Sequence, residues 1–308
     1  MCMRRLFGAE GHEMSTLEEL AARLLRAPLQ GVVPRRTGPE FVAEVAAFSP
    51  PAGTLAVWFL GQESVVWKAG GVTAWIDPYL SANPARRFDP LCAPQDVVAA
   101  DLVLITHEHS DHLDPRTCAG IATAAPDCRF VAPPCCRSML ERAGIAPARI
   151  LTPHTGEPQP LGSWRVTSVP AAHETVDWND ERGHRWTGYL VEVDGAGAYY
   201  HAGDTVICPE MLAALAPWTG RLELAMLPIN GRDYFRNAHD ILGNLTFREA
   251  AELAARLGAG VTVPLHYDLF HRVNEERPAH FLDYVYDKYP FLPTAVLAPG
   301  QLLLVPRR

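Results

Sequence analysis

Three histidines and an aspartate stand within residues 107–112, in the pattern H-x-H-x-D-H, directly after a short apolar run. Imidazole and carboxylate groups are ligands for Zn, Mn or Fe, and this pattern offers no thiolate. Just past a strand end, the chain can turn so that alternate side chains project into one cavity. We therefore expect His107 and His109 to hold one metal ion, and Asp111 and His112 to hold a second.

The ligand types favour a catalytic site over a structural one, because structural zinc sites more often use cysteines and close all four positions. Such a site needs further ligands, which should also follow strand ends. Three candidates do: His173, Asp204 and His266. A carboxylate at position 204 can bridge two metal ions. Taken alone, each of these three residues is explained as well by an ordinary surface or core position as by metal binding. Because all three follow a strand end, we interpret them as metal ligands.

The elements that must position these residues can be read from apolar periodicity and from Gly and Pro punctuation. Strands are expected at residues 54–60, 64–68, 72–76, 102–105, 164–169, 188–193, 198–200 and 261–265. Helices are expected at residues 15–25, 41–45, 116–124, 136–143, 246–257 and 281–289. The first three strands form an antiparallel meander, and residues 295–297 with 302–305 form a last hairpin.

No linker or low-complexity segment divides the chain. Strands and helices in both halves predict two sheets packed together with helices outside them. We expect one domain over residues 50–308, with residues 1–49 as an N-terminal helical extension packed on the core. The apolar faces of that extension are compatible with a homo-oligomer.

Composition limits the classes of function. The 308 residues are 48% hydrophobic and 20% charged, which is typical of a globular protein. The 27 Lys and Arg against 35 Asp and Glu give a net charge of −8, which argues against a nucleic-acid partner. No apolar stretch approaches 18 residues, so no transmembrane segment is expected, and residues 1–10 do not resemble a signal peptide.

The cysteines indicate a reducing compartment. They are odd in number and irregularly spaced: Cys2, Cys92, Cys118, Cys128, Cys135, Cys136 and Cys208. The adjacent pair suits neither an ordinary disulfide nor a C-x-x-C metal site. We interpret all seven as free thiols of a cytoplasmic protein.

These motifs together resemble the metallo-β-lactamase superfamily, over about residues 50–305. The resemblance implies an α+β fold, an αββα sandwich of two mixed β-sheets with helices on the outer faces. It also implies how seven positions share two metal ions. One ion is held by His107, His109 and His173, the other by Asp111, His112 and His266, and Asp204 bridges them.

Within that superfamily the chain looks like the L-ascorbate-6-phosphate lactonase branch. The segments that carry this resemblance are residues 53–61, 101–107, 200–204 and 263–268. N-acyl-phosphatidylethanolamine hydrolases of the phospholipase D type are similar relatives. The resemblance implies hydrolysis of a small anionic lactone or ester, phosphorylated or carboxylated.

The expected chemistry is attack by a metal-activated hydroxide. Two Mn or Zn ions, or Fe, lower the pKa of a bridging water and polarise the substrate oxygen. The family pattern suggests that Asp111 also acts in catalysis, orienting the hydroxide or accepting its proton. No Gly-x-Ser-x-Gly elbow is present, and none is required.

Two loops, residues 174–187 and 230–244, are candidates for the pocket wall. An arginine there can pair with phosphate or carboxylate, although solvated loop charges explain these residues as well. The substrate-binding candidates are Arg185, Arg232, Tyr234, Arg236, His239 and Tyr267. His201 and Asp268 are candidates for holding metal ligands in place from behind, with a packing role equally open.

Other functions remain open from the sequence alone. A phosphodiesterase acting on a nucleotide, nucleic acid or phospholipid would use the same ligands. An iron-dependent dioxygenase needs only one metal ion, whereas all seven positions are filled here. A diiron electron-transfer protein would need a flavin-binding domain, for which this chain has no room. A non-catalytic module would be expected to have lost ligands.

Overall fold

The computed structural model describes residues 34–270 and 276–308. One sheet has the strand order β15-β1-β2-β3-β4-β5-β6. Its strands are β1 (Thr54–Gly61), β2 (Ser64–Ala69), β3 (Val72–Ile76), β4 (Leu102–Leu104), β5 (Arg129–Val131), β6 (Ile150–Leu151) and β15 (Leu302–Pro306). The first three strands form the expected antiparallel meander, and β3 to β6 run parallel.

The other sheet has the order β14-β13-β12-β11-β8-β7. Its strands are β7 (Pro158–Leu161), β8 (Trp164–Pro170), β11 (Thr187–Val193), β12 (Gly197–His201), β13 (Leu222–Pro228) and β14 (Val261–Leu265). Strands β12, β13 and β14 are parallel, whereas β7, β8, β11 and β12 pair in antiparallel fashion, so both sheets are mixed. A separate short hairpin joins β9 (Trp178–Asn179) to β10 (Gly183–His184).

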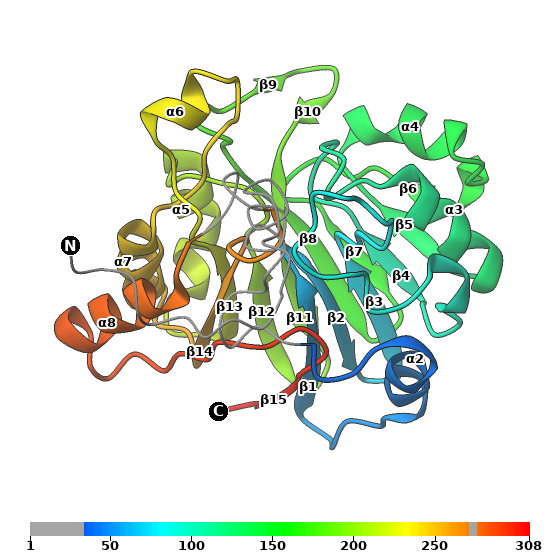
Figure 1. Cartoon of the computed structure of the whole chain (residues 1–308), viewed down its shortest axis with the longest axis horizontal. Helices are drawn as coiled ribbons and strands as arrows, with labels where there is room; N and C mark the ends of the chain where they lie inside the picture. The colour runs from blue at the N-terminus through cyan, green and yellow to red at the C-terminus, as the bar shows by residue number, and fades with distance from the viewer. Residues whose placement is uncertain (1–33, 271–275) are drawn as a thin grey trace, which may run out of the picture.

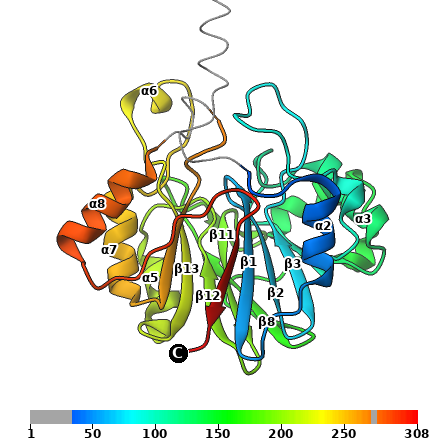
Figure 2. The same ribbon diagram turned by 60° about the horizontal axis from the view of Figure 1, so that its bottom comes forward.

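Helices cover the outer faces of both sheets (Figures 1 and 2). The α-helices are α2 (Gly38–Ala47), α3 (Pro115–Ala124), α4 (Arg137–Arg142), α5 (Pro209–Leu215), α6 (Tyr234–Asn237), α7 (Phe247–Leu257) and α8 (Pro278–Lys288). Helices α2, α3 and α4 pack on the first sheet, and α5, α7 and α8 pack on the second. The result is the αββα sandwich expected from the sequence. No helix in the described ranges is long and apolar enough to cross a membrane.

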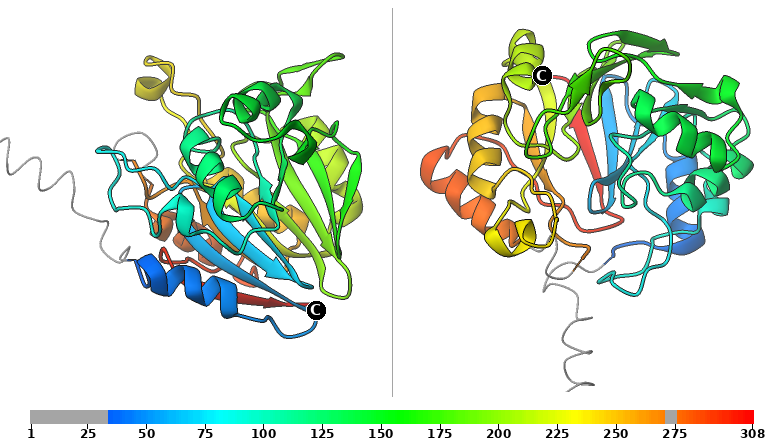
Figure 3. Two further views of the ribbon diagram at one scale, coloured as in Figure 1. Left: turned by 90° about the vertical axis from the view of Figure 1, so that its right-hand side faces the viewer. Right: turned by 90° about the horizontal axis from the view of Figure 1, so that it is seen from above.

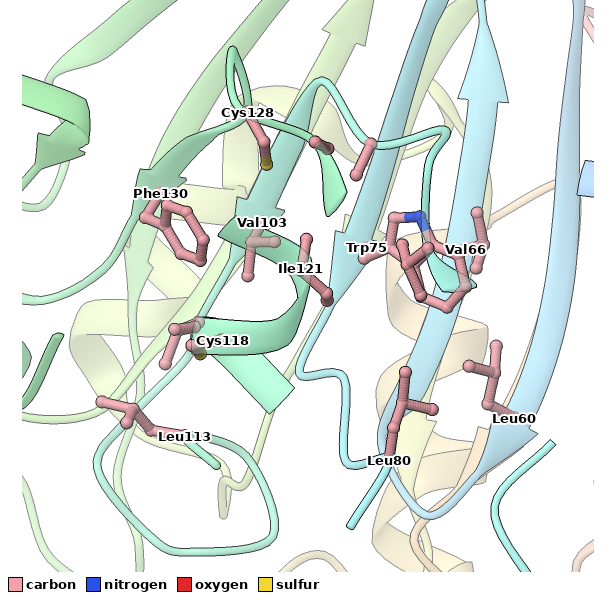
Figure 4. Packing of buried hydrophobic residues seen from close by; sticks show 14 of the residues in the cluster. Leu60, Val66, Trp75, Leu80, Val103, Leu113, Cys118, Ile121, Cys128 and Phe130 are labelled. Atoms are coloured by element: carbon pink, nitrogen blue, oxygen red, sulfur yellow. The ribbon is translucent and has the colours of Figure 1, made fainter. Parts of the chain in front are cut away.

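Strand β1 shows why the central strands are apolar on both faces. Leu55, Val57 and Phe59 pack between the two sheets, whereas the alternate residues Trp58 and Leu60 pack toward the helices. A strand covered on both sides loses the polar alternation of a half-exposed strand. Figure 4 shows the outer layer of this core, where residues of the sheet such as Val103 lie against Ile121 of α3.

The expected strands and helices of the described chain are present, within a few residues, with one exception. The predicted hairpin of residues 295–297 with 302–305 is wrong: β15 instead pairs antiparallel with β1, at the edge of the first sheet. The expected helix at 15–25 lies outside the described residues. Helix α2 packs Phe41 and Val45 on the core, and the domain boundary at residue 49 stays a prediction.

Strand β13 was not predicted, although it lies between β12 and β14 in the centre of the second sheet. Its charged residue, Glu223, interrupts the apolar run but is buried because Arg308 donates a hydrogen bond to it (Nε to Oε2, 3.0 Å). Because this partner lies 85 residues away, local periodicity carried no sign of it.

The two sheets contact each other at the edge where the chain leaves β4 and β12 and enters β11. The backbone N–H of Thr187, at the start of β11, donates to the carbonyl of Thr106, just past β4 (3.1 Å). Gly203, just past β12, has φ of +59°, and a Cβ there would lie 2.8 Å from side-chain carbons of Thr106. Only glycine tolerates both this φ and this approach. Thr106 and Gly203 thereby bring the chain segments after β4 and β12 together.

We predict that Gly203→Ala destabilises the protein more than Gly71→Ala does. Gly71 also has a positive φ (+80°), but a Cβ there meets nothing within 4 Å. The substitution at 71 therefore costs only backbone strain, whereas Gly203→Ala adds overpacking worth about 1–3 kcal/mol. Urea unfolding of both variants measures the difference in the free energy of unfolding; equal losses would mean that the contact with Thr106 is not constraining.

Candidate metal centre

The seven residues expected to bind metal ions come together at the joined ends of the two sheets. Their donor atoms form two groups, in each of which the donors lie within 4.8 Å of one another. The first group is His107, His109, His173 and Asp204; the second is Asp111, His112 and His266. The segments after β4, β8, β12 and β14 supply them, as the strand-end rule predicted.

Asp204 lies between the two groups. Its Oδ2 is 3.4 Å from Nε2 of His173, which belongs to the first group. Its Oδ1 is 3.1 Å from Nε2 of His266 and 3.5 Å from Nε2 of His112, both of the second group. One carboxylate therefore faces both groups with different oxygens, which is the placement required of a bridging ligand.

The donor set fits divalent cations. Nε2 of His107, Nε2 of His112 and Oδ1 of Asp204 are buried and have no hydrogen-bond partner among the described residues. Buried polar atoms are normally paired, because leaving them unpaired costs free energy. A cation that accepts lone pairs from these atoms would satisfy all three, and imidazole with carboxylate suits Zn, Mn or Fe.

Two ligands are held in place through their Nδ1 atoms. Nδ1 of His112 lies 2.8 Å from Oδ2 of Asp77, which also accepts a hydrogen bond from the Thr106 hydroxyl (2.6 Å). Nδ1 of His173 lies 3.0 Å from the carbonyl oxygen of Gly243. An acceptor at Nδ1 keeps the proton there and leaves Nε2 free to bind a metal ion.

The environment sets the protonation of the ligands. Burial lowers the pKa of His107, His109 and His173, so their neutral, metal-binding forms are favoured. Burial also opposes charge on His112, but Asp204 and the other nearby carboxylates outweigh it and hold the pKa of His112 well above its ordinary value. Burial alone would raise the pKa of Asp204, yet His266 and His112 hold it well below the usual range.

Gln62, in the turn between β1 and β2, contacts the second group. Its Nε2 donates to Oδ2 of Asp111 (2.6 Å) and lies 2.9 Å from Nε2 of His266. Its backbone N–H donates to Oδ1 of Asp268 (2.9 Å), and its carbonyl accepts from the N–H of His266 (3.0 Å). Asp268 therefore supports the Gln62 turn, and through it the ligands.

Four non-glycine residues around the centre have positive φ: Gln62, Asp77, Glu174 and His266. Such backbone is strained by about 1–3 kcal/mol per residue and persists only where surrounding contacts enforce it. Here the enforcing contacts are the hydrogen bonds of the site itself, such as that from His266 to Gln62.

His201 contacts Glu63 rather than a metal ligand. Its Nε2 lies 3.0 Å from the Glu63 carbonyl oxygen and 3.4 Å from Oε2 of the same residue, and its Nδ1 accepts from the N–H of Gly203 (3.3 Å). Because Nδ1 accepts, the ring is neutral. Burial lowers the pKa of His201 to about 4, and burial raises the pKa of Glu63 well above its ordinary value. The pair packs next to Asp204.

The three arginines expected to read an anionic substrate already have carboxylate partners. Arg232 pairs with Glu249 of α7 through two nitrogens (2.6 and 2.8 Å). Arg236 donates to Asp233 (2.7 Å) and to a backbone carbonyl. Arg185 pairs with Glu108, which stands between two ligands of the H-x-H-x-D-H motif.

The other three substrate-binding candidates differ in how far their side chains are exposed to solvent. Tyr234 is 78% exposed on α6, and His239 is exposed in the same loop, where its Nδ1 faces the carbonyl of Phe235 (2.7 Å). Tyr267 is fully buried: its ring stacks on Phe59 and its hydroxyl donates to the carbonyl of Leu297. The prediction that Tyr267 binds substrate is therefore wrong, because the ring faces the core.

Sequence reasoning missed four residues of the site: Gln62, Glu63, Asp77 and Thr106. They follow the ends of β1, β3 and β4, and all four are fully buried. The rule that identified the ligands, polar residues directly after an apolar strand, also selects these positions. The candidate ligands chosen from the sequence were five histidines and two aspartates, Asp111 and Asp204, so these four positions were passed over.

Comparisons with known proteins agree with this geometry. Residues 74–267 match the family model described as "Beta-lactamase superfamily domain". A protein of Thermococcus onnurineus (strain NA1), named UPF0173 metal-dependent hydrolase, is 31% identical over 234 residues, which cover 74% of this chain and 90% of that protein.

Among solved structures, Igni18, described as a novel metallo hydrolase from Ignicoccus hospitalis, has a TM-score of 0.65 and 24% identity, covering 83% of this chain and all of that one. CmlA, a diiron β-hydroxylase from Streptomyces venezuelae, has a TM-score of 0.62 and 18% identity, covering 82% of this chain and 54% of that one. These two likenesses show the shared fold.

We predict that Asp77→Asn weakens metal binding by about 10–100-fold, the usual cost of losing the group that orients a ligand. An amide has only one acceptor oxygen, so it cannot accept at once from the Thr106 N–H, which bonds Oδ1 of Asp77, and from His112, which bonds Oδ2. Calorimetric Zn²⁺ titration measures the affinity. Asp101→Asn is the matched control: it alters a carboxylate that accepts from the N–H of Thr73 (2.7 Å), away from the site, and should bind Zn²⁺ as the wild type does.

We also predict a pH-dependent loss of stability through His201. Its folded pKa of about 4 lies below its ordinary 6.5, so the unfolded state binds more protons between these values. The free energy of unfolding therefore falls as the pH drops from 6.5 to 4, by about 3 kcal/mol from this residue. His201→Gln should flatten the profile in this window, and His239→Gln, at an exposed histidine, should not. Parallel profiles for wild type and His201→Gln would contradict the assignment.

Proposed function

Because the chain belongs to the metallo-β-lactamase superfamily, we propose that it is a hydrolase that depends on two divalent metal ions. His107, His109 and His173 would hold one ion, Asp111, His112 and His266 the other, and Asp204 would bridge them. The observation that carries this proposal is the position of Asp204, whose two oxygens face the two ligand groups. Zn or Mn suits the ligands, and Fe is compatible with them.

Bound ions of this kind lower the pKa of a water and polarise the bond to be cleaved. Asp111 is the most suitable residue to orient that water and take its proton. Its side chain is 22% exposed, against 4% for Asp204 and 6% for His266, so it lies on the open side of the site. Gln62 donates to Oδ2 of Asp111 and thereby fixes the carboxylate, leaving Oδ1 for the proton.

The substrate we propose is a carboxylic ester or lactone with an apolar part. Two loops approach the site beside His173, and their tips carry exposed aromatic rings: Trp178 (53% exposed) on β9, and Tyr234 and Phe235 (78% and 75%) on α6. Figures 1 and 3 show both loops on the same side of the molecule. Exposed aromatic side chains on loops beside a site are candidates for contact with an apolar substrate.

An anionic lactone, expected from the lactonase resemblance, would have to displace a carboxylate from Arg232, Arg236 or Arg185. Each of these ion pairs is partly shielded from solvent, and an anion gains little from a guanidinium that is already neutralised. The resemblance to the lactonase branch therefore supports only the proposed type of reaction. The exposed aromatic side chains at the loop tips favour an apolar substrate over a phosphorylated one.

The test is hydrolysis by the Zn²⁺- or Mn²⁺-loaded protein of three compounds: an aliphatic lactone, a phosphorylated sugar lactone and bis(p-nitrophenyl) phosphate. We expect turnover of the aliphatic lactone, reduced about 10²–10⁴-fold in Asp111→Asn through loss of the proton acceptor. Asp283→Asn, an exposed carboxylate on α8, is the matched control and should retain the rate.

The other outcomes are equally informative. Turnover of the phosphorylated lactone alone would favour the anionic substrate, and turnover of the diester alone would make the protein a phosphodiesterase. Inactivity on all three, together with iron in the isolated protein and consumption of O₂, would overturn the hydrolase proposal in favour of an oxygenase.

A further inference from the structure

A second group of potential metal ligands lies beside the centre and belongs to neither set described above. It consists of Glu108, Cys135 and Cys136, whose donor atoms lie within 4.8 Å of one another. The two cysteines occupy the short 3-10 turn Pro134–Cys136 that leads into α4. Cys135 is half-buried, Cys136 is buried, and both are free thiols.

The spacing of the two sulfur atoms suits a single tetrahedral ion. The Sγ atoms are 4.0 Å apart. Two thiolates on one zinc, each about 2.3 Å from the metal at a tetrahedral angle, are about 3.8 Å apart. Oε2 of Glu108 lies 3.8 Å from Sγ of Cys135, and a carboxylate oxygen and a thiolate on the same ion are about 3.5 Å apart. Small side-chain adjustments would therefore place all three donors on one ion.

A disulfide between the same residues is disfavoured. Their Cα atoms are about 3.8 Å apart across a trans peptide bond, whereas bridged cysteines usually have Cα atoms about 4.4–6.8 Å apart. The sulfur atoms would also have to approach from 4.0 Å to about 2.05 Å. Chelation needs neither change.

We propose that Cys135, Cys136 and Glu108 form a separate binding site for a soft divalent cation, Zn²⁺ or Cd²⁺. Thiolate ligands select such ions, whereas the histidine and carboxylate donors of the metal centre suit harder ones as well. Binding replaces the two thiol protons, which leave to solvent, so two S–M bonds form and two S–H bonds break.

The charges at this site balance. Two thiolates and one carboxylate carry three negative charges, which a divalent cation and the guanidinium of Arg185 neutralise. Arg185 pairs with Oε1 of Glu108, so Oε2 is available to the ion without breaking that contact. A hydrogen bond from Cys136 lowers the pKa of Cys135, which makes it the first thiol to ionise.

The site is connected to the loop that covers His173. The Sγ of Cys135 lies 3.7 Å from the carbonyl oxygen of Arg185, whose guanidinium lies 5.1 Å from the ring centroid of Trp186. Trp186 in turn packs edge-on against His173 (5.9 Å between centroids). An ion bound to Oε2 of Glu108 would fix that residue and, through the Glu108–Arg185 pair, the 174–187 loop next to the metal centre.

The experiment is a Cd²⁺ titration of the full chain after its metal centre has been loaded with Mn²⁺. Cys2→Ser serves as the background, because Cys2 lies outside the described residues. Thiolate–Cd²⁺ bonds give an ultraviolet charge-transfer band that histidine and carboxylate ligands cannot produce. We expect this band to saturate at one Cd²⁺ per chain.

Cys135→Ser should lower the Cd²⁺ affinity by at least about 100-fold, since loss of a ligand costs more than loss of a group behind one. Cys208→Ser, at a buried thiol in another part of the fold, should leave the titration unchanged. Glu108→Gln should keep the charge-transfer band, because both thiolates remain, and should weaken Cd²⁺ binding. This variant tests the site even where Cys135→Ser does not fold.

No saturable band, or a band that persists in Cys135→Ser with unaltered affinity, would overturn the proposal. Phenylarsine oxide gives a second measurement, because it condenses with two thiols and releases one water. It should bind once per chain of the Cys2→Ser protein and not to Cys135→Ser.

Discussion

The arrangement of this protein depends on the close contact of its two sheets at Thr106 and Gly203. Each sheet supplies ligands only past the ends of its strands, so neither could form the centre alone. The contact requires a residue without a side chain at 203, and Asp204 follows immediately. The carboxylate that faces both ligand groups is thus positioned by the same backbone that joins the sheets. Asp77 adds a second constraint, because it binds Thr106 and His112 at once.

Electrostatics favours a cation at this centre. Asp77, Asp111 and Asp204 surround His112 and hold its pKa high, which reflects an excess of negative charge. The arginines at the rim do not offset it, because each is paired with a carboxylate of its own. The charge of a bound cation would offset this excess.

The sequence predicted the sandwich and the clustering of the seven candidate ligands because both follow from local rules. Apolar runs form strands, and polar residues directly after them meet at one edge. It did not predict partners that are distant in the chain. Glu223 in β13 is stabilised by Arg308, and β15 pairs with β1 rather than with its neighbour. Tyr267 turns into the core beside His266, which faces Asp204. The partners of the arginines were missed for the same reason, since an ion pair such as Arg232–Glu249 leaves no local pattern.

The hydrogen bond from His173 to the carbonyl of Gly243 has a thermodynamic consequence. It ties a candidate metal ligand to the loop that carries α6, whose aromatic rings are exposed. Free-energy coupling between two sites is reciprocal. A ligand that binds at the exposed rings of α6 and strengthens this hydrogen bond would tighten metal binding by some factor. The metal ion would then tighten binding of that ligand by the same factor. Substrate affinity and metal affinity would then not be independent quantities in this protein, and each would have to be measured at a stated concentration of the other.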